Sequence, residues 1–74
     1  MDAKEIQRLI SGYGLMDALE ERLQVVVVGG VARSTIYSTF QRGATSPRSE
    51  IILETAKKLI REHEETVEAA VLAL

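Results

Sequence analysis

The stretch that decides the fold reads ARSTIYSTFQRG and covers residues 32–43. Ile36 and Phe40 lie four residues apart, a spacing that places two side chains on the same face of a helix. Most other side chains in the stretch are polar, and a glycine follows where helices commonly end. The pattern therefore predicts a short helix that begins within residues 32–34, runs to Arg42 and buries one narrow stripe.

Two more helices are expected before this stretch. Asp2 and Glu5 have the spacing of a reciprocal N-terminal cap, and the apolar residues behind them share one face. Gly12 and Gly14 then end the first helix. Leucines at four-residue intervals predict a second helix over residues 15–23.

A run of four valines, two glycines and a fifth valine, VVVVGGV, follows at residues 25–31. Valine is stiff at its first side-chain torsion and favours strands, and Gly29-Gly30 permits a reversal of the chain. A lone strand leaves its ladder unsatisfied. We therefore expect a short β element that pairs with Val31 in a small hairpin or with the same strand of a second chain. The alternative is that the second helix continues through the valines as far as Gly29.

A long helix is expected after residues 32–43. Ser46 followed by Pro47 combines a cap residue with proline at the first helical position, and neither glycine nor proline occurs from Arg48 to the end. At ~1.5 Å per residue such a helix reaches about 40 Å, more than a globule of this size can cover. We expect the part up to Leu59 to cover the core and the last third to project.

The long helix carries a recurring series of mostly apolar residues at three- and four-residue intervals, typical of helices that pack along one seam. From His63 onward this series has nothing left in the chain to pack against. We therefore expect a homodimer in which this segment meets a second copy in an antiparallel or crossed arrangement. The series consists of Ile52, Ala56, Leu59, His63, Val67 (or Thr66), Ala70 and Leu74.

Together these patterns predict a single all-α domain over residues 1–74, with four helices and a short β element at residues 25–31. The composition agrees with a folded domain, since 46% of the residues are hydrophobic and 27% are charged. Only about 60% of the unfolded surface is buried in a chain this short. No disulfide can supplement the core, because cysteine is absent.

The charge of the chain is unevenly distributed. Nine Lys/Arg against eleven Asp/Glu give a net charge of −2. Residues 33–61 carry six basic and two acidic side chains, whereas residues 62–74 carry four acidic and no basic ones. Between Val31 and Ser49 there are three arginines and no acid. Such a basic stretch suits a surface that faces phosphates, because neutralising phosphates releases their counterions.

Two pieces of the sequence, LEERLQV at residues 19–25 and ARSTIYSTFQRG at residues 32–43, resemble the helix-turn-helix of phage repressors, Cro-like proteins and related bacterial regulators. In those families an acidic amphipathic helix is followed by a short turn and a helix of the form x-R-S-T-[IV]-Y-x-x-[LF]-x-x-G. The resemblance covers residues 15 to about 60. It departs at residues 26–31, which lengthen the turn by six residues, and at Ser38, where related recognition helices often carry Arg or Lys.

The resemblance implies a small transcriptional regulator of phage or mobile-element type that binds double-stranded DNA through a helix-turn-helix core at residues 15–43. The second helix of such a pair lies in the major groove. Arg33 can then pair with a guanine edge or a phosphate, and arginines flanking the helix can clamp phosphates. The expected DNA-binding residues are Arg33, Ser34, Thr35, Tyr37, Ser38, Gln41, Arg42 and Arg48.

The sequence lacks the residues that common catalytic and metal sites require. The single histidine, His63, cannot form a zinc site alone. No serine has the histidine and carboxylate pattern of a catalytic triad, and Gly29-Gly30 lacks the context of a phosphate-binding loop. We expect no enzymatic activity, no cofactor or metal, and no small-molecule ligand.

The N-terminal residues 1–10 carry charges throughout and lack an apolar signal core. The longest apolar run, residues 25–31, is far shorter than the ~20 residues of a membrane span. We therefore expect a cytoplasmic protein without a membrane partner. The competing functional class is a protein–protein adaptor, which would use residues 47–74 and the valine run as contact surfaces and bind no nucleic acid.

Overall fold

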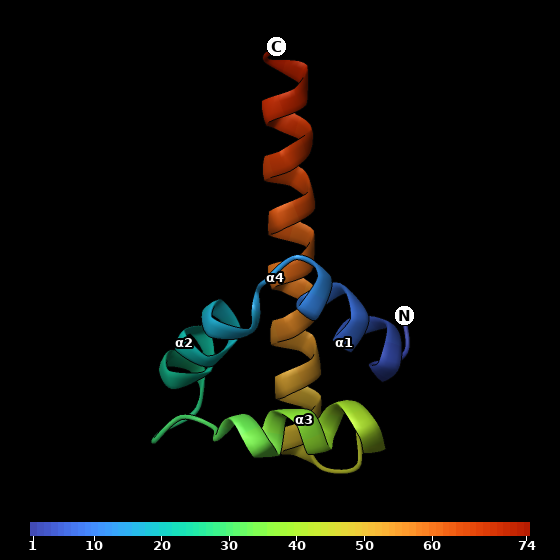
Figure 1. The fold of residues 1–74 in the computed structure, drawn as a ribbon. Coiled ribbons are helices and arrows are strands. Elements are labelled where there is room, and N and C mark those ends of the chain that lie inside the picture. The colour runs from blue at the N-terminus through green and yellow to red at the C-terminus, as the bar shows by residue number, and fades with distance from the viewer.

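The computed structural model describes residues 1–74 and contains four helices and no strand. The helix α4 forms a central rod, with α1 and α2 on either side of it and α3 across its base (Figure 1). The all-α class with four helices is confirmed. The helices are α1 (Ala3–Gly12), α2 (Met16–Val26), α3 (Arg33–Arg42) and α4 (Pro47–Leu72).

The predicted starts of the first and the last helix are confirmed. Asp2 is the N-cap of α1, and its Oδ1 accepts a hydrogen bond of 2.8 Å from the Glu5 backbone N–H. At the start of α4, Ser46 and Ser49 cap each other: the backbone N–H of Ser49 donates to Ser46 Oγ, and that of Ser46 donates to Ser49 Oγ. These contacts satisfy N–H groups that a helix start leaves without partners.

All four helices contribute to one core, in which the stripe of α3 packs against α1 and α4. The predicted stripe residues Ile36, Thr39 and Phe40 are buried. Each fully buried large apolar side chain contributes about 1.5–3 kcal/mol, so this stripe fixes which side of α3 faces inward. The core residues are Ile6, Ile10, Leu19, Leu23, Ile36, Phe40, Ile52, Leu53, Ala56, Leu59 and Ile60.

The predicted β element at residues 25–31 is wrong. Val25 and Val26 form the last turn of α2, so the helical alternative holds for these two residues and fails before Gly29. Within one chain no second strand lies beside the valines, whereas the helix already supplies each backbone N–H with an acceptor. The intrinsic strand preference of valine is small compared with that saturation of hydrogen bonds.

Residues 27–30 form a tight turn instead, closed by a hydrogen bond of 2.8 Å from the Gly30 N–H to the Val27 carbonyl. Gly29 and Gly30 adopt φ of +83° and +72°, values that valine would reach only with strain. Val27 packs against the core, while Val28 is fully exposed. The chain therefore leaves α2 by a sharp turn and reaches α3 in a loop.

The last third of α4 projects from the globule, as predicted. Every residue from Glu64 onward is exposed, and Figure 1 shows the C-terminal turns rising beyond the other helices. The molecule is 42 Å long, and its radius of gyration is 12.7 Å, against about 11 Å for a compact chain of this length. None of the four helices combines the length and the apolar composition that crossing a membrane requires.

Candidate nucleic-acid interface

The side of α3 opposite its buried stripe is polar. Ser34, Thr35 and Gln41 are exposed, Ser38 is half-buried, and Tyr37 is 40% exposed. The helical period places these residues away from the core because Ile36 and Phe40 occupy the inward side. The face is therefore a row of small hydroxyl groups with one amide and one phenol.

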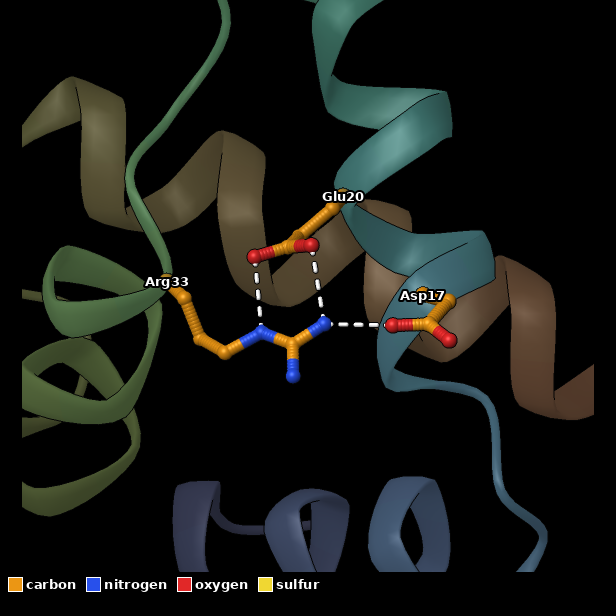
Figure 2. A network of polar contacts seen from close by, with 3 residues as sticks. All are labelled: Asp17, Glu20 and Arg33. Carbon is orange, nitrogen blue, oxygen red and sulfur yellow. Dashed lines mark hydrogen bonds and ion pairs between the residues drawn. The ribbon is translucent and has the colours of Figure 1, made fainter.

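Arg33, the first residue of α3, is bound by two carboxylates of α2 (Figure 2). Its Nε and Nη2 donate to the two carboxylate oxygens of Glu20 at 2.8 and 2.9 Å, and Nη2 also donates to Asp17 Oδ1. The hydrogen bonds from Arg33 hold the pKa of Glu20 below its usual value, and those of Glu20 and Asp17 raise the pKa of Arg33. Bidentate contacts of this kind have defined geometry.

This network has two consequences for the site. The charge of Arg33 is neutralised by two carboxylates, so this end of α3 offers no net positive charge to a phosphate. The network also joins α2 directly to α3, which the chain itself connects only through the loop at residues 27–32. It therefore fixes the position of the start of α3 relative to α2.

The other end of α3 presents positive charge. Arg42 is its last residue, and Arg48 lies in the first turn of α4, with a loop of four residues between the two helices. Both side chains are exposed and neither takes part in an ion pair. The loop is ordered by Gly43 at φ +81° and by a hydrogen bond of 2.9 Å from the Thr45 N–H to Ser49 Oγ.

The predicted site residues thus fall into two groups. Seven of the eight lie on the outward side of α3 or at its C-terminal end, whereas Arg33 is bound within the chain. The partners of Arg33, Asp17 and Glu20, were not among the predicted site residues. The sequence contains one indication that Arg33 binds within the chain. Arg33 precedes Ile36 by three residues and Phe40 by seven, so it lies on the flank of the buried stripe and not on the outward side.

No protein family, curated protein or solved structure matches the chain.

Proposed function

We propose that this protein binds double-stranded DNA through the outward side of α3 and acts as a small transcriptional regulator of phage or mobile-element type. The supporting observation is the polar side of α3, left free by the core, with two unpaired arginines at its C-terminal end. A helix of this diameter fits the major groove of B-DNA. Its small side chains allow a close approach to the base edges.

Each exposed residue then has a role that suits its chemistry. Gln41 can bind an adenine edge through its amide, and Ser34 and Ser38 can donate to or accept from either base. Tyr37 and Thr35 lie on the two flanks of this row, where the sugar–phosphate walls of the groove would be. Arg42 and Arg48 bind phosphates, which fixes the position of the helix without reading sequence.

Arg33 has a different role in this proposal from the one its position in the sequence suggests. Arg33 donates hydrogen bonds through Nε and Nη2 to Glu20 and Asp17. It therefore holds α3 at a fixed angle to α2 and does not contact DNA. The buried stripe of α3 sets which side of the helix faces inward, and the Arg33 network adds a direct connection between the start of α3 and α2. Arg33 is thus a positioning residue.

The experiment measures the affinity for labelled duplexes by fluorescence anisotropy over a series of salt concentrations. Binding should weaken steeply with salt, because each phosphate contact contributes about −0.9 to the slope of log K against log salt. Arg42→Ala and Arg48→Ala should each make this slope shallower by about 1, with an unchanged helical circular dichroism spectrum. Arg8→Ala, an exposed arginine on α1, is the matched control and should leave the slope unchanged. Wild-type protein that fails to bind any duplex contradicts the proposal.

One observation favours the adaptor function as the second candidate. Val26 and Ile51 are 50% and 40% exposed, and both line one hollow between the end of α2 and the start of α4. Large apolar side chains gathered on a surface mark contact sites for other proteins. An adaptor that binds only through these residues would give no binding in the duplex titration, so the same experiment separates the two functions.

A further inference from the structure

The projecting part of α4 and the two residues after it carry a mostly apolar stripe, and the chain covers only its first member, His63. His63, Val67, Ala70 and Leu74 follow one another at intervals of four, three and four residues, the spacing of a seam between paired helices. We call these four residues the distal stripe. It continues the line of the buried residue Ile60, yet Val67 is 48% exposed and Leu74 fully exposed.

The base of the distal stripe is a shaped surface. The loop between α1 and α2 crosses α4 there (Figure 1): the ring of Tyr13 lies 4.5 Å from that of His63, and the Tyr13 hydroxyl donates to Glu64 Oε2 at 2.7 Å. Above this crossing is a hollow lined by Tyr13, His63, Glu64, Val67 and Glu68. The globule therefore ends in a partly apolar hollow on the same side of α4 as the stripe.

We propose that the distal stripe binds the distal stripe of a second copy in an antiparallel pair. The segment from His63 to Leu74 has 12 residues and spans about 18 Å at the rise of an α-helix, which the chain keeps as far as Leu72. Full antiparallel overlap sets Val67 against Ala70 of the partner subunit and places Leu74 of the partner subunit beside His63. That leucine then enters the hollow against the Tyr13 ring, and the same contact is made at the other end.

The globule itself excludes a parallel pair. Paired helices approach to about 8–10 Å between their axes, and in a parallel pair both α1–α2 loops would have to occupy that space. In the antiparallel pair each loop meets only the end of the partner helix. The second globule then lies beyond the tip of the first rod.

The charges on the segment favour the same direction. Glu64, Glu65 and Glu68 all lie in the lower half of the projecting part, and no basic residue lies above Arg61. A parallel pair would set each of these carboxylates beside its own copy. The antiparallel pair moves the two acidic groups to opposite ends of the contact, where water and salt screen them.

Because only 12 residues of each chain take part, we expect a contact smaller than the ~1,200 Å² of a standard stable interface and a dimer that depends on concentration. Sedimentation equilibrium of the full chain should show the mass rising from 8.2 kDa toward twice that value as concentration increases. Val67→Glu should keep the protein monomeric. Leu72→Glu is the matched control, because Leu72 lies five residues further on, on another side of the helix, and it should still form the dimer.

Engineered disulfides test the direction of the pair, and the absence of native cysteine makes them specific. His63→Cys and Leu74→Cys are made singly, mixed and oxidised. The mixed disulfide should dominate, because two copies of position 63 lie about 16 Å apart in the antiparallel pair. A dominant disulfide between two His63→Cys chains would overturn the proposal, as would a monomer at every concentration, which would leave the stripe to a different protein. Neither measurement involves DNA, so this inference stands apart from the proposed function.

Discussion

Arg33 binds two carboxylates of α2, whereas the sequence predicts a DNA contact for it. It occupies the position at which a helix-turn-helix commonly contacts DNA, and its sequence neighbours Ser34 and Thr35 suit that purpose. Its guanidinium nevertheless lies between Glu20 and Asp17 (Figure 2). Exposed ion pairs are individually weak. A guanidinium group bound to two oxygens of one carboxylate, however, has its orientation restricted more than a single contact would restrict it.

Exchanging the charges of this network tests whether Arg33 positions α3 or binds phosphate. Arg33→Glu alone places three carboxylates together, and we expect it to weaken DNA binding roughly tenfold, the equivalent of about 1.4 kcal/mol of binding free energy. Arg33→Glu combined with Glu20→Arg rebuilds the ion pair with the charges reversed. The double variant should recover most of the wild-type affinity in the anisotropy titration.

A phosphate contact gives the opposite result in this experiment. The double variant still lacks a cation at position 33, so its affinity would remain as low as that of Arg33→Glu. Glu21→Arg in the Arg33→Glu background is the matched control, because Glu21 lies one residue along α2 and does not contact Arg33. It adds the same charge and should not restore binding.

At the scale of elements, the sequence predicts three of the four helices closely, and the physical reason is local. Caps and breakers such as Asp2, Ser46 and Gly43 act within a few residues, so their effect can be read without knowing the fold. The sequence predicts the end of α2 less closely, because valine propensity and helix continuation disagree there. The absence of a partner strand decides the outcome, and Val27 then packs against the core, neither of which is visible in the local pattern.

Gly29→Ala tests the turn that replaces the expected strand, and Gly12→Ala serves as its control. Gly29 has φ +83° with open space around its Cα, so Gly29→Ala should cost about 1 kcal/mol of unfolding free energy through backbone strain alone. Gly12, the last residue of α1, has no positive φ and equally open surroundings. Gly12→Ala should therefore stabilise the protein by about 0.5–1 kcal/mol.

Urea denaturation of both variants measures these differences directly. A strand at residues 25–31 would give a different pattern, since alanine would then be tolerated at Gly29 without a positive φ. Equal stability of Gly29→Ala and the wild-type protein would contradict the turn.

At the scale of the whole molecule, the spacing of apolar residues predicts which residues form the core. It also predicts that α4 extends beyond that core. Leu19, Leu23, Ile36 and Phe40 meet the first half of α4, as their intervals suggest. The sequence does not predict which loop crosses α4 at its midpoint. That crossing depends on Tyr13 reaching His63, 50 positions away, and it places the Tyr13 ring at the base of the distal stripe.

The two proposed surfaces lie at opposite ends of α4, with α3 at its base and the distal stripe at its tip (Figure 1). In the antiparallel pair the two starts of α4 are then about 65 Å apart at ~1.5 Å per residue. Adjacent major grooves on one side of a duplex repeat at about 34 Å. The two copies of α3 also point away from each other, so one straight duplex cannot bind both.

We therefore expect the dimer to bridge two duplexes. A labelled duplex should be retained by the wild-type protein on beads that carry a second, unlabelled duplex, at concentrations where sedimentation shows dimer. Val67→Glu should bind each duplex separately and bridge none, whereas Leu72→Glu should bridge like the wild type. Dimeric protein that binds DNA but bridges no duplexes would contradict the antiparallel pair, in which the two copies of α3 point away from each other.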